Sequence, residues 1–395
     1  MLFRILYVVF LTCQLLWGSY YLGGIITPRQ LMVLVMFVAC VAVKDIKFDR
    51  YWWLYSVFLL CFGLSSFLTG FSDQFIHQLI GLYFASYVAY RSTFAMVKRY
   101  HSENVIINTF LVIGLLDALV TIGQFFNYDI ANTIVDLMHF SGTSERFINL
   151  QDRMDTMYGV AIPGIVGDVL NGYLLSFVSV FALYNKNGRL AFHNIIFWLV
   201  IVFGSYCVQE RSGFFTGIVL SVFMMFKVLS NVTKKYRIIT FSLFFLVVIL
   251  SGMYLFDALS VSETRYSIGF DMSSRDAIYG YSWDFFIQHP FGGFFLLAEN
   301  GVLPHNLFLS ALIFGGLIGG VMICIILWMQ FSKMLPSFIA PIKGHHGYMM
   351  LLFALAYVAF TVNSLWHNLS IVSGDATLWI IWGGFLSLSE METAG

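Results

Sequence analysis

The sequence carries little charge for its length. Of its 395 residues, 11% are charged and 59% are hydrophobic, and the mean hydropathy is +0.82. Soluble domains carry charged residues at about 25%, so this composition excludes an ordinary soluble domain. Apolar runs of roughly 20 residues, the length that crosses a bilayer, recur along the whole chain. The sequence therefore predicts an all-α, polytopic membrane protein.

Cysteine is also scarce, and the charges of opposite sign cancel. The five cysteines are an odd set inside apolar runs, so they predict neither a disulfide framework nor a metal site; they are Cys13, Cys40, Cys61, Cys207 and Cys324. Lys+Arg and Asp+Glu both total 21, so net charge indicates no class of partner. No paired-carboxylate metal motif stands out, and we predict neither a metal ion nor a cofactor.

Charge clusters and Gly, Pro and Asn breaks divide the chain into about twelve predicted helices within one membrane domain, 1–395. The first lacks a small-residue cleavage site and is predicted to be a retained helix, not a signal peptide. The predicted helices are 3–21, 28–43, 52–69, 75–92, 104–126, 161–184, 192–209, 212–229, 238–256, 305–330, 347–366 and 371–388. A smaller connection, 127–160, and a large one, 257–304 between the ninth and tenth helices, fall on the same side.

The placement of basic residues predicts the orientation. With a cytoplasmic N-terminus, all nine lysines and half of the arginines lie on the inner side, as the positive-inside rule requires. The outer basic residues are Arg29, Arg146, Arg153, Arg211, Arg265 and Arg275. Both termini are therefore predicted to be cytoplasmic, and both long connections lie outside.

The outer side carries arginine without lysine. A guanidinium presents a rigid fork of donors that matches phosphate oxygens, and it is easier to desolvate than an ammonium group. This choice favours an outward site for a phosphate or diphosphate. Salt bridges between these arginines and outer acidic residues are the alternative.

Three of the outer arginines are candidate ligands for such a group. Arg211, in "VQERSGFFTGIVL", is predicted at the outer membrane boundary, where it either meets a ligand or pairs with Glu210 and snorkels. Arg275, in "DMSSRDAIYGYSWDFFIQHPFGG", precedes aromatic residues that predict an amphipathic helix on the bilayer surface. Arg265, in "SETRYSIG", lies in the same connection. For Arg265 and Arg275 the alternative is a solvated loop position.

The segment "LPHNLFLSALIFGGLIGG" places an imidazole at the start of a membrane helix. Pro304 suits the first position of a helix, so His305 is predicted beside the positive end of the helix dipole. A neutral imidazole there can accept a proton from a hydroxyl, and anions are favoured nearby. The alternative is a structural hydrogen bond. The pairs Gly315/Gly319 and Gly316/Gly320 predict close packing on a neighbouring helix.

Other polar residues lie in or near the predicted spans. Asp117, Asp168 and Asp375 are costly there, so they either pack structurally or belong to the cation pathway of a transporter. His367 and Asn368, in "LWHNLSIVSGD", repeat the His-Asn pair of the preceding segment on the outer side and are predicted to line the same cavity.

Four segments in order carry a resemblance to a known family. They are "MYGVAIPGIVGDVLNGYLLS" (157–176), "ERSGFFTG" with Arg211, "SSRDAIYGYSWDFFIQHPFGG" with Arg275, and "PHNLFLSALIFGGLIGG" with His305. The chain resembles the membrane glycosyltransferases that polymerise or ligate bacterial surface glycans, the O-antigen ligase and O-antigen or capsule polymerase superfamily. The resemblance covers about 155–325, and the first five helices agree only in number and placement.

The resemblance implies a GT-C-like fold in the bacterial inner membrane, with the 257–304 connection capping a periplasmic cavity. A glycan on polyprenyl (undecaprenyl) diphosphate would be the donor. Arg211 and Arg275 would bind the diphosphate and His305 would be the essential histidine, with Arg265, Asn306 and His367 as further substrate-binding candidates. Expected partners are this lipid-linked oligosaccharide, membrane lipid, and a chain-length regulator and flippase of the same pathway, but no nucleic acid.

Several alternatives remain for the activity. A polymerase transfers the glycan to another lipid-linked repeat unit and a ligase transfers it to lipid A core; the sequence around Glu210 is more similar to the polymerases, since ligases often carry Ser or Thr there. Inversion at the anomeric carbon is the simplest outcome, because no loop carboxylate is singled out for a covalent route. A transporter or flippase would show interrupted helices in two related halves, and no internal repeat is seen. A sensory or scaffold role is a further alternative.

Overall fold

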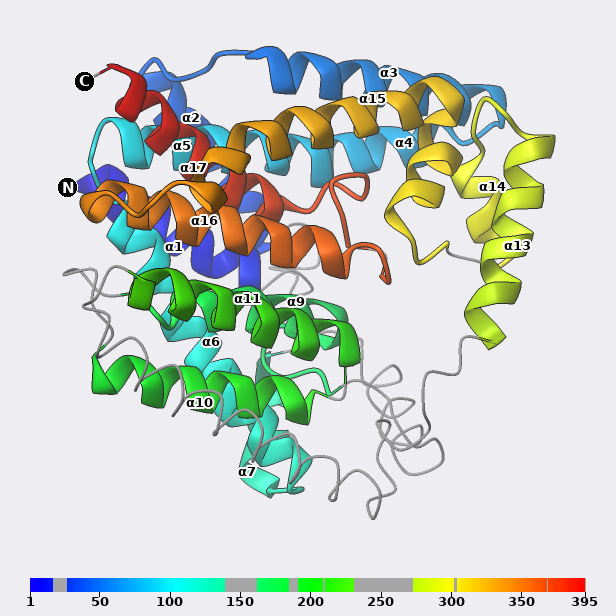
Figure 1. Ribbon diagram of the computed structural model, residues 1–395. Coiled ribbons are helices and arrows are strands. Elements are labelled where there is room, and N and C mark those ends of the chain that lie inside the picture. The colour runs from blue at the N-terminus through cyan, green and yellow to red at the C-terminus, as the bar shows by residue number, and fades with distance from the viewer. Residues whose placement is uncertain are drawn as a thin grey trace.

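The computed structural model describes residues 1–16, 27–138, 162–184, 191–208, 210–230, 273–301, 304–367 and 369–394. Within these ranges the chain is helical and has no strand (Figure 1). The elements are α1 (Leu2–Leu16), α2 (Pro28–Ala42), α3 (Arg50–Leu68), α4 (Ser72–Gln78), the π-helix η1 (Leu79–Tyr83), α5 (Phe84–Lys98), α6 (Glu103–Phe125), α7 (Asp129–Met138), α9 (Asp168–Phe181), α10 (Phe192–Cys207), α11 (Arg211–Ser230), α13 (Ser273–Gln288), α14 (Phe294–Glu299), α15 (Leu307–Ile339), α16 (Gly344–Asn363) and α17 (Ala376–Ala394).

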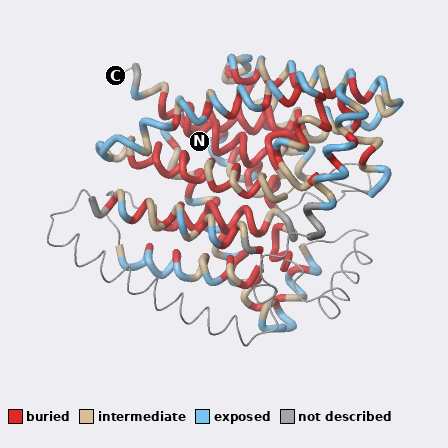
Figure 2. Tube along the Cα trace, turned by 45° about the vertical axis from the view of Figure 1, so that its right-hand side comes forward, coloured by how far each residue is buried: buried red, intermediate tan, exposed pale blue. Residues whose placement is uncertain are grey.

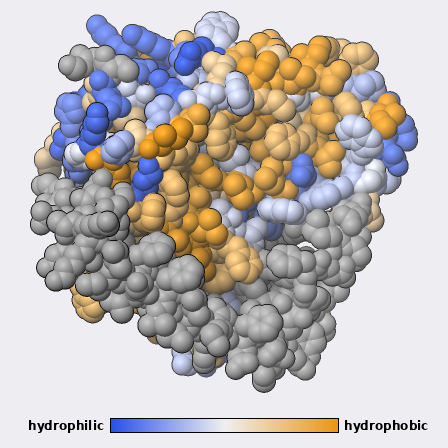
Figure 3. Space-filling view, in the orientation of Figure 1, coloured by the Kyte–Doolittle hydropathy of each residue, from blue (hydrophilic) through white to orange (hydrophobic). Residues whose placement is uncertain are grey.

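The all-helical prediction is confirmed. Among the described helices, α3, α6, α15 and α16 are long and apolar enough to cross a membrane, and α1, α2, α9, α10 and α11 are shorter apolar helices. The predicted helix 238–256 lies outside the described residues. The visible face carries a broad hydrophobic band, with hydrophilic residues gathered at the upper left and at the right edge (Figure 3). This distribution suits a protein embedded in a membrane.

The long helices run side by side, and both chain ends lie at the same end of the bundle (Figure 1). The closest pairs are α17 with α5, α15 with α3, and α11 with α9, while α16 packs on α9 and α17. The short helices α13 and α14 lie at the opposite end and contact α15. They belong to the predicted large connection 257–304, and α7 belongs to the smaller one, 127–160. The central helices are buried along most of their length (Figure 2).

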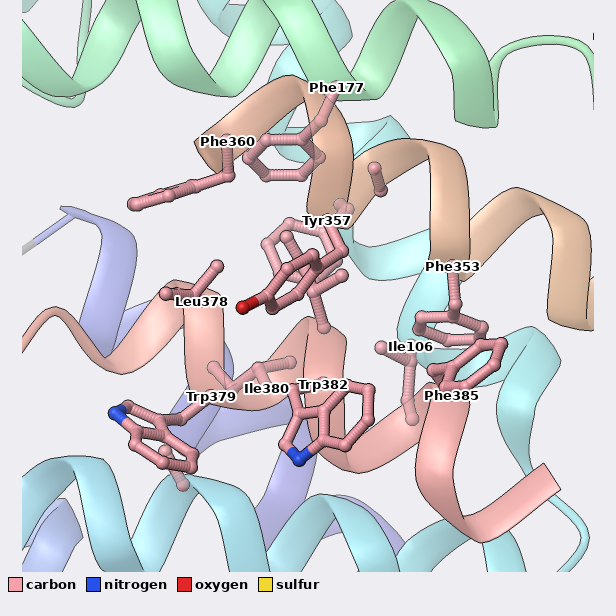
Figure 4. Packing of buried hydrophobic residues seen from close by; sticks show 14 of the residues in the cluster. Ile106, Phe177, Phe353, Tyr357, Phe360, Leu378, Trp379, Ile380, Trp382 and Phe385 are labelled. Atoms are coloured by element: carbon pink, nitrogen blue, oxygen red, sulfur yellow. The ribbon is translucent and has the colours of Figure 1, made fainter. Parts of the chain in front are cut away.

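Aromatic side chains fill the interior between α3, α5, α16 and α17. Trp379 packs edge-on against Trp52, with ring centroids 4.9 Å apart, and Trp382 packs on Tyr51 at the same distance. Figure 4 shows Trp379, Trp382 and Phe385 with Tyr357 and Phe353 in this core. Since lipid tails are as apolar as these side chains, such close van der Waals packing, not exclusion of water, holds membrane helices together.

Helix α15 is broken at Gly316, where φ is 63° and ψ is −166°. The segment between α13 and α14 supplies hydrogen bonds in place of the helical bonds that are lost at this break. Gly293 N donates to Ile313 O (2.8 Å), and Leu317 N donates to Pro290 O (3.0 Å). Backbone without helical bonds is tolerated at membrane depth only where protein groups satisfy it. Figure 1 shows the first turns of α15 set at an angle to the rest.

The glycine pairs of α15 divide into two roles. Gly315 and Gly319 face Phe58 and Cys61 of α3, so the predicted close packing on a neighbouring helix is confirmed for this pair. Gly316 instead makes the break, and a Cβ there would lie 2.6 Å from the carbonyl carbon of Phe291. The spacing of small residues predicts close packing, but it does not distinguish packing from a break.

The start of the sixth predicted helix is a buried loop. The sequence predicts a helix from 161, but α9 begins at Asp168, and Gly164 and Gly167 have φ of +57° and +103°. The loop N–H groups are satisfied by side chains of α6: Gly164 N donates to Gln124 Oε1 (3.0 Å) and Ile165 N donates to Asp117 Oδ1 (2.8 Å). Because these acceptors lie 40 and 48 residues before their donors in the chain, local sequence does not reveal them.

A buried ion pair links α5 to the α2–α3 connection. The Arg91 guanidinium pairs with Asp45 and lies 3.9 Å from Asp49, and the side chains of Arg91 and Asp45 are 5% and 8% exposed. We expect Asp45→Ala to lower the free energy of unfolding by about 3–5 kcal/mol, since it leaves a buried guanidinium without its main partner. Thermal unfolding in detergent measures the loss.

A matched control is the exposed pair of Lys98 and Glu390, whose side chains are 46% and 40% exposed. We expect Lys98→Ala to change the free energy of unfolding by less than about 1 kcal/mol, because solvent screens an exposed pair. Equal losses for the two variants would contradict a special role for the buried pair.

Candidate functional site

A carboxylate–imidazole pair lies at the start of α11. The Oε1 atom of Glu210 is 2.5 Å from Nε2 of His367, and the two side chains are 4% and 16% exposed. The Ser212 hydroxyl lies 3.3 Å from both of these atoms. The Tyr173 ring of α9 meets the imidazole edge-on, with centroids 5.9 Å apart. The contact between Ser212 and His367 joins residues that are 155 positions apart in the chain.

The Glu210 side chain packs closely against the backbone of α9. A Cβ at Gly172 would lie 1.5 Å from Glu210 Oε2, so only glycine leaves room for this carboxylate. The same Oε2 atom is buried and has no hydrogen-bond partner within the described ranges. A buried carboxylate with one oxygen unpartnered is costly, and such groups concentrate at functional sites.

His305 lies immediately before the cap of α15. The sequence predicts that Pro304 opens this helix, and the structure corrects the prediction: α15 begins at Leu307 and Asn306 is its N-cap. The Asn306 side chain accepts from Phe308 N (3.0 Å) and Leu309 N (3.2 Å), which satisfies two of the free N–H groups of the first turn. His305 consequently sits outside the helix, with φ of +41°.

Asn306 also joins α15 to the segment that follows α16. Its Nδ2 donates to Leu365 O at 3.1 Å, two residues before His367. Both ends of its amide are thus engaged within the protein. This gives Asn306 a structural role that ties the start of α15 to the His367 segment; its predicted role as a substrate ligand stays a prediction.

The helix that carries Arg275 reaches the same place. Tyr279, one turn after Arg275 in α13, donates from its hydroxyl to His305 O at 3.3 Å. The predicted helix in this connection is confirmed, but its apolar residues do not share one face: Phe285 is buried, whereas Tyr281 and Trp283 are about half exposed.

For Arg211 and Arg275, the structure describes the backbone but not the side chain. Arg211 is the first residue of α11 and Arg275 is the third residue of α13. Their side chains, together with Arg265 and Asn368, lie outside the described part of the chain. The structure therefore places the elements of Arg211 and Arg275 but leaves their binding roles as predictions.

Two of the three predicted membrane carboxylates accept hydrogen bonds from backbone. Asp117 holds the loop before α9 through Ile165 N, and Asp375 accepts from Thr377 N at 2.7 Å at the start of α17. Asp375 also attracts Arg29 electrostatically. The Asp168 side chain lies outside the described residues. These contacts favour structural packing for Asp117 and Asp375.

An apolar groove of about 350 Å³ runs along α15. Its lining includes Phe308, Leu312, Gly320, Cys324 and Trp328. Phe308 lies two residues after the cap Asn306, so the groove begins close to the start of α15 and extends toward its middle. Trp328 and Phe308 are 74% and 46% exposed, as expected for a surface that faces lipid.

The residue that sequence reasoning missed is Glu210 as the partner of His367. The sequence analysis names a pair with Arg211, its neighbour in the chain, as one alternative for Glu210. An acidic residue at a predicted outer helix end and an outward histidine were both visible, but their proximity depends on the packing of α9, α11 and α16. Among the described residues, no group of three or more His, Cys, Asp or Glu is placed to hold a metal ion.

Comparisons with family models, with curated proteins and with solved structures give no match to this chain. The class of protein that the fold defines is therefore an all-helical protein with helices suited to a membrane. The resemblance to membrane glycosyltransferases rests on the sequence motifs alone.

Proposed function

We propose that the protein is a membrane glycosyltransferase that polymerises a bacterial surface glycan, an O-antigen or a capsular polysaccharide. Its donor is a glycan on polyprenyl (undecaprenyl) diphosphate, and its acceptor is a hydroxyl of another lipid-linked repeat unit. The reaction takes place at the periplasmic face of the inner membrane. The chain crosses this membrane about twelve times in a GT-C-like fold, with both termini in the cytoplasm and the 257–304 connection over the site.

The observation that supports this proposal most is the convergence of the sequence motifs. Tyr279 of the Arg275 helix contacts the backbone of His305, and Asn306 contacts the segment that leads to His367. His367 in turn contacts Glu210 and Ser212, the two neighbours of Arg211 in the chain. Motifs spread over more than 150 residues thus meet at one end of the bundle, as a single site requires.

The chemistry of a diphosphate-linked sugar fits these residue types. The diphosphate of the donor is itself the leaving group. The enzyme therefore has to stabilise negative charge on the departing diphosphate and accept a proton from the incoming hydroxyl. Arg211 and Arg275 are assigned to the diphosphate, and Arg265, Asn306 and His367 are further candidates for contacts to substrate. The resemblance gives His305 the role of general base. The transfer needs no metal ion or cofactor in this scheme.

The apolar groove on α15 supports a lipid-linked substrate. An isoprenoid chain needs an apolar surface open to the bilayer, and the groove begins at Phe308, beside the segment that carries His305. A donor bound there would have its lipid against α15 and its diphosphate toward the outer end. The remaining expected partners are membrane lipid, a chain-length regulator and a flippase of the same pathway.

Two other activities are distinguished by experiment. A ligase uses the same donor and passes the glycan to lipid A core. A transporter or flippase would move the lipid-linked glycan without forming a glycosidic bond, with Asp117, Asp168 and Asp375 as its coupling groups. The backbone contacts of Asp117 and Asp375 favour the transferase.

Deletion of the gene in its native host, followed by complementation and gel analysis of the surface glycan, tests the proposal. We expect the deletion strain to show a single repeat unit on core and the wild-type gene to restore a ladder. Bare core with polymer accumulating on the lipid carrier would identify a ligase. A loss of all repeat units from the periplasmic face would identify a flippase.

A further inference from the structure

The proposed reaction brings two lipid-linked diphosphates to the outer membrane boundary at the same time. The donor loses its diphosphate, to which Arg211 and Arg275 are assigned, whereas the acceptor keeps its own diphosphate throughout the transfer. Both groups are anions that have to be held while the sugars meet. A second site for a diphosphate is therefore needed near the candidate site, and a guanidinium fork is the group that suits it.

Arg29, at the start of α2, has a guanidinium that is held in place but only partly used. Of the predicted outer arginines, it is the one whose side chain the structure describes. Its Nε donates to Gln14 Oε1 at 2.8 Å, and Gln14 Nε2 donates back to Arg29 O at 3.3 Å. Gln14 is 5% exposed, so this reciprocal pair fixes the orientation of the guanidinium. Neither Nη atom donates to a group within the described residues, which leaves the end of the fork for another acceptor.

The nearest carboxylate does not take up this fork. Asp375, at the start of α17, attracts Arg29 electrostatically, but the two side chains form no ion pair within the described part of the chain. Asp375 Oδ1 instead accepts from Thr377 N at 2.7 Å. Arg29 itself is neither fully buried nor fully exposed. A partly desolvated guanidinium whose Nη donors meet no protein acceptor favours an anion as its ligand.

Arg29 lies on the side of the candidate site that faces α2 and α17. Glu210 contacts His367 within that site. The carboxylates of Glu210 and Asp375 both act electrostatically on the hydroxyl of Tyr173, so both lie near this one side chain. Asp375 in turn attracts Arg29. This series of interactions connects the Arg29 guanidinium to the residues that meet at the outer end of the bundle.

We propose that Arg29 binds the diphosphate of the acceptor, the lipid-linked repeat unit whose hydroxyl receives the glycan. The inference rests on the proposed function and adds a second anion subsite to it, while the roles of Arg211, Arg275 and His305 stay as assigned. Arg29 takes no part in bond making, because the acceptor hydroxyl and the acceptor diphosphate are at different places on the repeat unit. Asp375 weakens this binding, since a carboxylate near an anion repels it.

The first test counts the molecules of farnesyl diphosphate that bind the full-length protein in detergent, by native mass spectrometry. We expect the wild type to bind two, one at Arg211 and Arg275 and one at Arg29. Arg29→Gln and Arg211→Ala should each bind one. Arg4→Gln is the matched control and should bind two, because Arg4 is an exposed arginine at the end of the bundle where α1 begins.

The second test measures transfer in liposomes, with polymer on its lipid carrier as the donor and a farnesyl-linked repeat unit as the acceptor. Arg29→Gln should raise KM for the acceptor by about 10- to 100-fold, the usual loss when hydrogen bonds to a charged group are removed, and leave kcat nearly unchanged. Arg29→Lys keeps the charge without the fork and should give an intermediate KM. Asp375→Asn, which can still cap α17, should bind two molecules and lower KM.

Rates are compared per amount of folded protein, measured by gel filtration in detergent. Two molecules bound by Arg29→Gln, an unchanged KM in this variant, or fewer than two bound by the wild type would overturn the proposal. Displacement of one molecule by phosphatidylglycerol would also overturn it, because the site would then hold a membrane phospholipid. So would the loss of one molecule in Asp375→Asn, since Arg29 and Asp375 would then be a structural pair. Wild-type protein that binds two molecules but forms no glycosidic bond would instead reject the proposed function.

Discussion

Replacing Arg211 by alanine should lower kcat for glycan transfer by about 10²–10³-fold, the usual loss when one donor to a developing anion is removed. Arg211 is the first residue of α11, between Glu210 and Ser212, both of which contact His367. We propose that its guanidinium binds the diphosphate. The effect should fall mainly on kcat, since negative charge on the diphosphate grows as the sugar departs. The rate of polymer formation in liposomes measures it.

Arg211→Lys separates charge from geometry. An ammonium group keeps the charge but loses the fork that binds two phosphate oxygens at once, so we expect a rate between those of the wild type and Arg211→Ala. Arg146→Ala, which removes a predicted outer arginine without an assigned role, should keep the wild-type rate. Equal losses for Arg146→Ala and Arg211→Ala would contradict a specific diphosphate site and indicate a general effect of outer charge.

Gly316→Ala should destabilise the fold strongly. The backbone at Gly316 lies in a region that is almost restricted to glycine, which alone is worth about 1–3 kcal/mol, and the new Cβ would lie 2.6 Å from the carbonyl carbon of Phe291. Since that neighbour is backbone, it cannot turn away as a flexible side chain could. We expect a clear fall in the thermal unfolding midpoint in detergent. We also expect slower transfer, because the Pro290–Gly293 segment, which lies between α13 and α14 and is hydrogen-bonded to α15, would be displaced.

Gly347→Ala is the control for this variant. Gly347 lies in α16, a Cβ there has open space, and its backbone is helical. Alanine should be neutral or slightly stabilising at this position. If Gly316→Ala were as stable as Gly347→Ala, then the break in α15 would not be required for the fold.

The sequence predicts the all-helical fold, because long apolar segments have few alternatives to a helix in a membrane. The prediction fails where side chains or backbone groups from distant parts of the chain determine the local backbone conformation. The loop before α9 stays non-helical because Asp117 and Gln124 of α6 satisfy its N–H groups. Likewise, α15 breaks at Gly316 because Pro290 and Gly293 supply the missing hydrogen bonds. Neither partner set is visible in the local sequence.

The sequence also predicts the candidate site only in part, because some of its contacts join residues that are far apart in the chain. The sequence predicts an outward position for His367, and general capping preferences fit Asn306 as the N-cap of α15. The pairing of Glu210 with His367 is not readable from the chain, because it depends on how α9, α11 and α16 pack. The motifs indicate which residues carry chemistry, and the packing indicates which of them act on one another.

The central claim is that this protein forms glycosidic bonds from a lipid-diphosphate donor. The most direct measurement uses purified protein in liposomes with the lipid-linked repeat unit as both donor and acceptor, followed by separation of the products by size. We predict a ladder of polymers on the lipid carrier and release of the free polyprenyl diphosphate, without added metal ion. Unchanged repeat units, or repeat units moved across the bilayer without a new bond, would contradict the account.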